Sequence, residues 1–187
     1  MRKVVLFMLS SLDGGVEHPA RYFPEGDGDG APVFDPVTAG MEAHMTASQD
    51  AVLMGRKTYD EWSYWWPRAE DEPFAEFINP VRKYVFTSTP LAREWTNAEP
   101  VADPVPDFVR ALKETPGGDI GVHGSITLAQ TLLHEELVDE INLAVGRVLF
   151  PEGRRLFTGL EGPRELDLVR AIPTPTGSLW LTYRPHQ

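Results

Sequence analysis

The sequence predicts an α/β fold with a mostly parallel central sheet and an antiparallel strand pair at its C-terminal end. Short, unbroken apolar runs such as 4–9 and 51–54 are typical of strands buried on both faces, and they alternate with segments of helical periodicity. Two further runs, at 165–172 and 178–183, are joined by a turn with proline and glycine, which predicts a hairpin. The length of 187 residues predicts a single domain over residues 1–187, without a linker or an internal repeat.

The first half of the chain has a clear helix start. Asp35 followed by Pro36 is typical of the first positions of a helix, because the carboxylate accepts free N–H groups and proline fits the first turn. Val37, Met41 and Met45 would form the apolar stripe of that helix. The other elements expected in this half are strands at 4–9 and 51–54, an acidic loop at 17–32, a helix at 56–62 and a short helical piece at 74–78.

The second half repeats the alternation of strands and helices. Asp103-Pro104 has the same helix-start pattern, Gly117-Gly118 predicts the end of that helix, and Ser125 can cap the next helix with its hydroxyl. The strands expected in this half lie at 83–87, 98–101, 119–122 and 138–149, followed by the terminal hairpin.

Charge and composition limit the classes of ligand. The formal net charge of −11 argues against nucleic acid or an anionic membrane as partners through a broad electrostatic field. An anionic small molecule would need a local basic site, for which Arg56 and Lys57 are candidates. Without cysteine there is no disulfide framework and no thiolate nucleophile. The short N-terminal apolar run lacks a clean cleavage site, and no run is long enough to cross a membrane, so we expect a cytoplasmic protein with a small-molecule substrate.

Residues 51–61 form the most informative segment. The apolar strand ends at Gly55, and Arg56, Lys57 and Thr58 open a helix. A strand that leads through glycine into a helix start brings free backbone N–H groups and two cations to one point, which is a favourable seat for a phosphate. An ordinary strand-to-helix turn has the same spacing, so that alternative stays open.

A second turn of this kind lies within 121–133. Gly124 permits close approach of the backbone, and beyond Ser125 the N–H groups of Ile126 and Thr127 would face an anion. In open α/β sheets, ligands bind at the carboxyl ends of the strands, where both turns are expected. The G-x-G-x-x-G fingerprint is absent, which disfavours a Rossmann dinucleotide site.

Other candidate sites have weaker signals. The acidic loop imitates half of a calcium-binding loop at Glu25, Asp27 and Asp29, but Pro36 stands where the last ligand is required. The five histidines lack metal-ligand spacing, so no metal site is predicted. His123 lies at a predicted ligand turn and is either a substrate ligand or a structural turn residue.

An aromatic group follows the first phosphate-type turn. Trp62, Tyr64, Trp65 and Trp66 lie within five residues of each other. They form either part of the core or of a subunit interface, or a wall on which a flat heterocycle stacks. The first interpretation is favoured for Trp62, and both remain open for Trp65 and Trp66.

Four segments resemble the dihydrofolate-reductase-like superfamily, and more closely the branch that contains the reductase domain of riboflavin biosynthesis. They are Ser11–Gly14, Met54–Tyr59, Val85–Pro90 and the stretch from Gly124 through Glu140 to Phe157. The resemblance covers the chain from end to end. It implies a three-layer α/β/α fold of dihydrofolate-reductase type. It also implies NADPH-dependent hydride transfer to a small heterocyclic (pterin- or pyrimidine-like) or ribosylamine substrate, as in 5-amino-6-(5-phosphoribosylamino)uracil reductase.

The resemblance also implies which residues bind NADPH. Those near the phosphates would be Gly55, Arg56 and Thr58, with Lys57 beside them; those near the adenosine 2′-phosphate would be Thr87 and Ser88; and those along the pyrophosphate and nicotinamide would be Gly124, Ser125, Ile126 and Thr127. Because these cations and hydroxyls suit a 2′-phosphate, we expect NADPH to bind better than NADH.

The catalytic proton donor is not identified from the sequence. True dihydrofolate reductases carry an acidic residue on the helix before the Met-Gly-Arg turn, but here Asp35 would cap that helix and Glu42 lies further along it. Glu42 and Asp13 are the candidates, and neither matches the family position. A nucleotide-binding protein of this fold without turnover and a true dihydrofolate reductase remain alternatives. The resemblance also predicts a homodimer, with its contact at strand 138–149.

Overall fold

The computed structural model describes residues 1–23, 32–69 and 72–186. The strands are β1 (Val4–Ser10), β2 (Gln49–Gly55), β3 (Arg82–Phe86), β4 (Ala98–Val101), β5 (Asp119–His123), β6 (Glu140–Val145), β7 (Leu166–Pro173) and β8 (Leu179–Pro185). The α-helices are α1 (Pro36–Thr46), α2 (Arg56–Trp65), α3 (Pro73–Ile78), α4 (Val105–Lys113) and α5 (Ile126–His134). Short 3-10 helices lie at Pro19–Arg21 and Trp66–Arg68.

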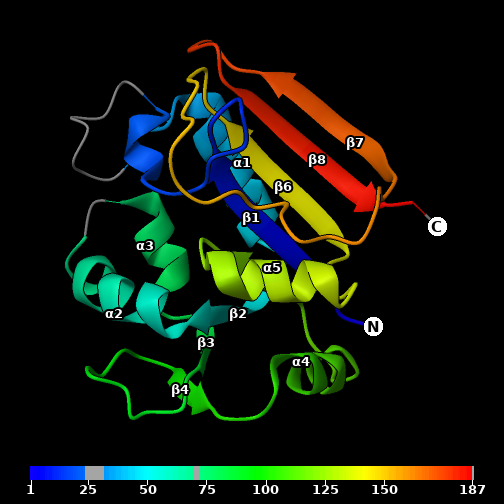
Figure 1. Ribbon diagram of the computed structural model, residues 1–187. Coiled ribbons are helices and arrows are strands. Elements are labelled where there is room, and N and C mark those ends of the chain that lie inside the picture. The colour runs from blue at the N-terminus through cyan, green and yellow to red at the C-terminus, as the bar shows by residue number, and fades with distance from the viewer. Residues whose placement is uncertain (24–31, 70–71, 187) are drawn as a thin grey trace.

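All the strands belong to one sheet in the order β4-β3-β2-β5-β1-β6-β8-β7. Neighbouring strands from β4 to β6 pair in parallel, whereas β8 is antiparallel to both β6 and β7. The two edges of the sheet, β4 and β7, lie at opposite ends of the molecule (Figure 1). The predicted fold class is confirmed, including the antiparallel C-terminal pair.

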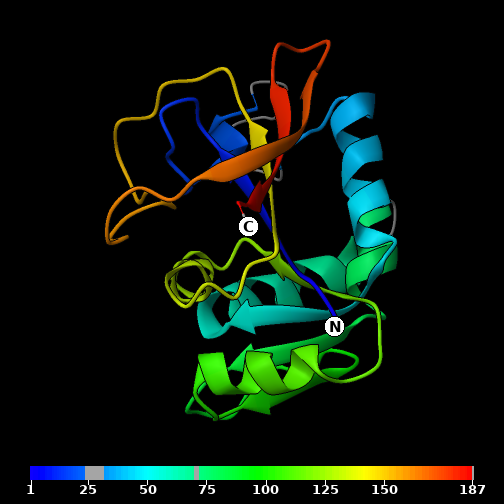
Figure 2. The ribbon, with the colours of Figure 1, turned by 90° about the vertical axis from the view of Figure 1, so that its right-hand side faces the viewer.

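Helices cover both faces of the sheet because successive strand residues point to opposite sides. On one face α4 and α5 pack over a core that includes Leu6, Leu53 and Val122. On the other face α1 packs toward Val5 and Phe7, and α2 and α3 cover a neighbouring cluster. Figure 2 shows β1 between α1 and α5, which is seen nearly end-on. The hydrophobic effect thus holds three layers together.

The helix starts agree with the sequence in one case and differ in another. Asp35 caps α1 as expected, because its side chain accepts the N–H groups of Val37 and Thr38. The expectation that Asp103 caps the next helix is wrong, since α4 begins at Val105 with Pro104 in the cap position. That helix is held instead by its buried face, where Val109 is fully buried.

Two boundaries also differ from the sequence prediction. α4 ends at Lys113, before the glycine pair at 117–118, because Glu114 already closes its last turn. The long strand expected at 138–149 is only β6, over Glu140–Val145. After Val145 the chain leaves the sheet at Gly146, whose N–H donates to the Ser10 carbonyl and where a side chain would collide with the Tyr22 backbone.

The predicted dimer contact at 138–149 stays a prediction. β6 is paired on both edges, with β1 and with β8, and most of its residues are buried. Leu149, which follows β6 in the same range, is 69% exposed.

Candidate functional site

The two turns predicted to bind phosphate lie side by side at the carboxyl edge of the sheet. β2 and β5 are adjacent parallel strands, with Leu53 opposite Val122. Gly55 ends β2, and Gly124 directly follows β5. The starts of α2 and α5 are therefore neighbours, although Gly55 and Ser125 are 70 positions apart in the chain.

Ser125 joins the two turns through its side chain. The Gly55 N–H donates to Ser125 Oγ at 3.0 Å, and Ser125 Oγ donates to Thr58 Oγ1 at 2.8 Å. The expectation that this hydroxyl caps α5 is wrong, because it is directed to the start of α2 instead. Ser125 is buried, so its role in this arrangement is to position both turns. Sequence spacing could not reveal a contact between strands that are distant in the chain.

Arg56 holds a third turn against the other two. Its Nε donates to both carboxylate oxygens of Asp60 at 2.8 Å, and its Nη1 donates to Thr89 Oγ1 at 2.6 Å and to the Pro90 carbonyl at 2.8 Å. Thr87 Oγ1 lies 3.4 Å from the same nitrogen. The structure thus brings the predicted Arg56 and Thr87 together. Asp60 was missed, although its i,i+4 spacing from Arg56 on a helix is a recognisable signal.

The remaining predicted residues border the same edge. Lys57 and Ser88 are exposed to solvent, and Ile126 packs partly against the core. Thr127 Oγ1 accepts a hydrogen bond from Arg154 at 3.0 Å, which adds a cation beside the first turn of α5. Arg154 is a residue that sequence analysis did not single out. The sequence pointed to Arg154 only in that it lies within the stretch ending at Phe157 that resembles the reductase family.

Gly124 has the backbone conformation that the sequence suggested for a tight turn. Its φ of +73° lies in the left-handed region that favours glycine, and the residue is exposed. A Cβ atom there would lie 3.5 Å from Trp62 Cζ2, so the turn passes close to the aromatic group. Two helix starts, an exposed glycine and the cations Arg56 and Lys57 suit a phosphate-bearing nucleotide cofactor.

His123, the last residue of β5, is fully enclosed. Its Nε2 lies 2.8 Å from Gln49 Oε1, while Gln49 Nε2 donates to the Met45 carbonyl at 3.5 Å. This network assigns the proton to Nε2 and leaves Nδ1 as an acceptor, without a hydrogen-bond partner in the described structure. Burial lowers the pKa of His123 to about 3, so the imidazole is neutral.

The aromatic group encloses this histidine together with α3. Trp62 and Trp66 lie 5.8 Å and 4.9 Å from Phe74, between ring centroids, and Phe74 lies 5.5 Å from His123. The core interpretation of Trp62 is confirmed, since it packs against a buried cluster. Trp65, by contrast, is 64% exposed.

Some buried polar atoms of this region have no hydrogen-bond partner. Within the described ranges, the buried side-chain atoms without a hydrogen-bond partner are Ser63 Oγ, Trp66 Nε1 and His123 Nδ1. Buried polar groups are normally paired, because an unmade hydrogen bond costs about 1–3 kcal/mol. Ser63 lies on α2, Trp66 directly after α2 and His123 at the end of β5.

The Asp13 carboxylate links the loop after β1 to the loop that contains Phe150 and Arg155. Its Oδ1 accepts the Phe150 N–H and the Ser11 hydroxyl, both at 2.7 Å, and its Oδ2 accepts Arg155 Nη2 at 3.1 Å. The Phe150 and Ser11 hydrogen bonds, with that of Arg155, lower the pKa of Asp13 to about 2. A carboxylate held in its ionised form is a poor proton donor, so these contacts favour a structural role.

Glu42 lies in a different environment on α1. It is half-buried in a row with Thr38 and Thr46, which are both buried and each lie four residues from it along the helix. Burial, and then the nearby charge of Glu72, raise the pKa of Glu42 to about 7. Glu72 precedes α3, so Glu42 belongs to the side of α1 that is closest to α3.

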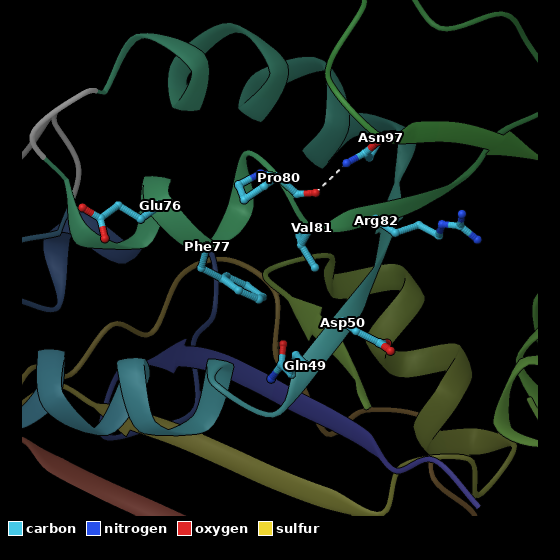
Figure 3. Close-up of a pocket in the computed structure, with 8 residues that line it drawn as sticks. All are labelled: Gln49, Asp50, Glu76, Phe77, Pro80, Val81, Arg82 and Asn97. Carbon is cyan, nitrogen blue, oxygen red and sulfur yellow. Dashed lines mark hydrogen bonds between the residues drawn. The ribbon is translucent and has the colours of Figure 1, made fainter. Parts of the chain in front are cut away.

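Two hollows lie at the opposite edge of the sheet, where the strands begin. The larger, of about 500 Å³, is lined by the starts of β2 and β3 and the end of α3. Figure 3 shows Phe77 and Gln49 at this hollow and the hydrogen bond from Asn97 to the Pro80 carbonyl. The other, of about 180 Å³, borders Asn142. Ligands of open α/β sheets bind at the carboxyl edge, so neither hollow is the expected cofactor seat.

Metal and membrane signals are weak throughout the described residues. In those residues no group of three histidine or acidic side chains could hold a metal ion, and no helix is long and apolar enough to cross a bilayer. The calcium-like acidic residues at 25, 27 and 29 lie outside the described ranges.

Comparison with known families decides between the possible superfamily branches. Residues 2–179 match the model of the RibD C-terminal domain. The chain belongs to this family. The match confirms the resemblance inferred from the sequence and supports a reductase-like function in riboflavin biosynthesis.

Individual relatives support the same fold. The uncharacterized protein YyaP of Bacillus subtilis (strain 168) is 28% identical over 186 residues, which cover 97% of this chain and 94% of YyaP. A putative riboflavin biosynthesis protein from Shewanella sp. PV-4 aligns with a TM-score of 0.73 at 21% identity, covering 99% of each chain. Dihydrofolate reductase from Enterococcus faecalis, complexed with NADP(H) and RAB-propyl, aligns with a TM-score of 0.63 at 13% identity, covering 99% of this chain and 97% of that one.

Proposed function

We propose that this protein is an NADPH-dependent reductase that transfers a hydride to a small planar heterocycle or to a ribosylamine that carries one. NADPH, when bound, supplies the hydride, and the chain supplies binding, orientation and a proton. The family supports a reductase-like function, and the choice of cofactor and substrate rests on the residues at the carboxyl edge.

The observation that carries the proposal is the pair of hydrogen bonds made by Ser125. They hold the starts of α2 and α5 together, so one extended ligand can contact both turns. Arg56, Lys57, Thr87 and Ser88 lie on the α2 side and would receive the 2′-phosphate. Gly124 lies on the α5 side, where an exposed backbone allows the pyrophosphate to approach.

The unpartnered buried atoms support a planar substrate. His123 Nδ1 offers an acceptor, Trp66 Nε1 a donor and Ser63 Oγ either. A ring with an N–H beside a C=O, as in pyrimidines and pterins, presents the complementary pair. The Trp66 ring, for which stacking stayed open in the sequence, offers a face on which such a ring could stack.

Glu42 is our candidate for the proton donor. A pKa of about 7 leaves the carboxyl partly protonated near neutral pH, which suits general acid catalysis. α1 and α3 both border His123, the first through the Met45–Gln49 link and the second through Phe74. Glu42 is on the side of α1 near α3. A substrate bound between these two helices would therefore lie close to the Glu42 carboxyl group.

A turnover assay tests the proposal and separates it from its alternatives. Purified protein is mixed with NADPH and a pyrimidine ribosylamine, dihydrofolate or another pterin, and the loss of NADPH absorbance is followed. Oxidation with the pyrimidine substrate supports the proposal, and oxidation with dihydrofolate alone would make the protein a true dihydrofolate reductase. NADPH binding without turnover on any of them would indicate a nucleotide-binding protein that lacks the reaction.

The variant Glu42→Gln tests the proton donor. Below the unfolded pKa of 4.5 the protonated Glu42 stabilises the fold fully, and this contribution is lost as the pH rises through about 7. Glutamine keeps the neutral form, so the variant should gain about 1–3 kcal/mol of unfolding free energy relative to wild type between pH 4.5 and pH 8. Urea melts at both pH values measure this gain.

Kinetics separate a chemical role for Glu42 from a structural one. A proton donor predicts that Glu42→Gln lowers kcat and removes the loss of rate above about pH 7 that wild type shows. A purely structural residue would alter stability and leave the shape of the pH profile unchanged. An unchanged profile would therefore remove Glu42 from the mechanism.

A further inference from the structure

A buried glutamine makes the hydrogen bond that decides the state of His123. Gln49 is the first residue of β2, and its side chain lies between the last turn of α1 and the imidazole ring. Its Nε2 donates to the Met45 carbonyl at 3.5 Å, and its Oε1 lies 2.8 Å from His123 Nε2. The two residues are 74 positions apart in the chain and meet because β2 and β5 are neighbouring strands.

The fold leaves room for this contact at Gly121. Gly121 lies on β5 two residues before His123, so both residues face the same side of the sheet. A Cβ atom at Gly121 would overlap Gln49 Oε1 and would lie 2.7 Å from His123 Nε2. The hydrogen bond between Gln49 and His123 therefore passes over a backbone position where any residue other than glycine would displace it.

Aromatic rings enclose the rest of the imidazole. Phe7 of β1 lies 6.0 Å from the His123 ring, and Phe74 and Phe77 of α3 lie 5.5 Å and 5.8 Å from it, between ring centroids. Figure 3 shows Phe77 directed from α3 toward Gln49. Phenyl rings neither carry nor accept an exchangeable proton. Among the described side chains, Gln49 is therefore the one that hydrogen-bonds to His123.

The Met45 carbonyl orients the glutamine amide and, through it, the histidine proton. A carbonyl only accepts hydrogen bonds, so the amide nitrogen of Gln49 faces Met45 and the amide oxygen faces His123. An oxygen at this place requires an N–H group at His123 Nε2, which leaves Nδ1 of the neutral ring as an acceptor. We propose that Gln49 is a positioning residue that fixes the proton of His123 on Nε2, so that Nδ1 accepts a hydrogen bond from an N–H or amino group of the substrate.

The place of His123 in the sheet supports a substrate as this donor. His123 ends β5 at the carboxyl edge and directly precedes Gly124, the turn proposed for the pyrophosphate. Its Nδ1 is buried and has no partner in the described structure, whereas buried acceptors are normally paired. The class of donor rests on the proposed function, since pyrimidine and pterin rings carry N–H and amino groups. A ring that offers only acceptors here would leave the buried nitrogen unpaired and would bind poorly.

Nitrogen NMR of the histidine side chains locates the proton without substrate or turnover. Long-range proton–nitrogen spectra distinguish the protonated ring nitrogen from the bare one, and the His123 signals are those missing in His123→Asn. Wild type should carry the proton on Nε2. Gln49→Met keeps the side-chain length but removes the acceptor, so a second tautomer with the proton on Nδ1 should appear. Gln130→Met, on α5 at the other face of the sheet, is the matched control and should leave the His123 signals unchanged.

Gly121→Ala tests the same contact with Gln49 in place. The added methyl group would displace the glutamine oxygen from His123 Nε2, so this variant should show the same second tautomer. Gly40→Ala on α1 is its control, because the Cβ position at Gly40 has open space around it. Circular dichroism melts show which variants fold, and the tautomer of the wild-type protein tests the proposal even if neither does.

A pair of ligands tests the hydrogen bond to the substrate. Uracil has two ring N–H groups, whereas its N,N′-dimethyl derivative has the same ring and none. With NADPH present, uracil should shift the His123 Nδ1 resonance and should bind at least about tenfold more tightly than the dimethyl derivative. In Gln49→Met this preference should largely disappear. If the methyl groups were merely too large for the site, the preference would persist in the variant.

Three results would overturn the proposal. The first is a wild-type His123 that carries its proton on Nδ1. The second is a tautomer that stays unchanged in folded Gln49→Met or Gly121→Ala. The third is a wild-type Nδ1 resonance that uracil does not move at concentrations up to tens of millimolar, or a preference for uracil that Gln49→Met retains.

These outcomes are distinguishable from a failure of the proposed function. Turnover of a pyrimidine or pterin by a protein with the proton on Nδ1 would refute the role of Gln49 and retain the reductase. A protein with the proton on Nε2 that binds uracil through Nδ1 but oxidises no NADPH would retain the role of Gln49 and refute the reductase.

Discussion

The two ends of the sheet use their exposed groups in opposite ways. At the carboxyl edge of β2 and β5, polar side chains are fixed by hydrogen bonds between turns, as with Ser125 and Arg56. At β7 the outer backbone edge pairs with no other strand of the described residues, and leucines are exposed. A fixed polar surface around free helix starts favours a small anionic ligand, whereas an unpaired apolar strand favours another chain.

This difference predicts that the two regions can be changed separately. A substitution at the carboxyl edge should alter nucleotide binding and leave the molecular mass of the protein unchanged. A charge reversal on β7 should leave nucleotide binding unchanged. If it altered nucleotide binding, the two regions would be coupled through the sheet.

Gly124→Val should have the largest effect. The side chain would occupy the space through which the pyrophosphate approaches, and NADPH binding should be lost. Valine at a φ of +73° adds strain of about 1–3 kcal/mol, less than the stability of a typical domain, so the protein should still melt cooperatively. Circular dichroism melting beside a cofactor titration measures both properties.

Gly162→Val is the matched control for this substitution. Gly162 also has a positive φ, of +81°, and its Cβ position has open space around it. The control therefore introduces the strain without blocking the turn, and should lower the melting temperature while NADPH still binds. Native NADPH affinity in a folded Gly124→Val protein would mean that this turn is not the cofactor seat.

Arg56→Ala should have an intermediate effect that depends on the cofactor. Loss of a charge-assisted hydrogen bond to the 2′-phosphate should weaken NADPH by roughly 1–3 kcal/mol and NADH much less. If the affinity for both cofactors falls, part of that shared loss would come from release of the Thr89 turn, which Arg56 holds in place. Titrations of both cofactors measure the difference, with Arg110→Ala as an exposed arginine control. Equal affinity of wild type for the two cofactors would contradict the assignment.

Ser125→Ala should have the smallest effect of the three. It removes the bonds to Gly55 and Thr58, which loosens the contact between the turns without removing a cation, and should weaken NADPH by about 1 kcal/mol. Ser63→Ala is the control, because Ser63 is also buried but has no partner in the described structure. It should leave NADPH binding unchanged. Equal effects from both serines would show that the link between turns does not matter for the cofactor.

The sequence predicted those features that depend on neighbouring residues. Strand positions followed from apolar runs, and the α1 cap followed from Asp35 beside Pro36. The two phosphate-type turns were found because each has glycine between an apolar strand and a helix start. The end of the strand that starts at Glu140 could not be predicted this way, because Gly146 leaves the sheet through its contact with Tyr22, far away in the chain.

Roles that depend on distant residues were decided only by the tertiary structure. Ser125 looks like a cap from its position, yet the parallel pairing of β2 with β5 brings Gly55 and Thr58 within reach of its hydroxyl. His123 at a turn gave no indication that its ring is enclosed by α3 and neutral.

By itself, therefore, the sequence determined the order of the elements, the family and the location of the turns, since these follow from local periodicity, local stereochemistry and motif. Only the fold decided which strand is exposed and which polar groups meet. The apolar run at 138–149 gave no sign of its place in the sheet, yet among the described strands β6 lies between two neighbours and β7 has one. Burial and hydrogen bonding depend on what surrounds a residue in space, and chain order does not specify those neighbours.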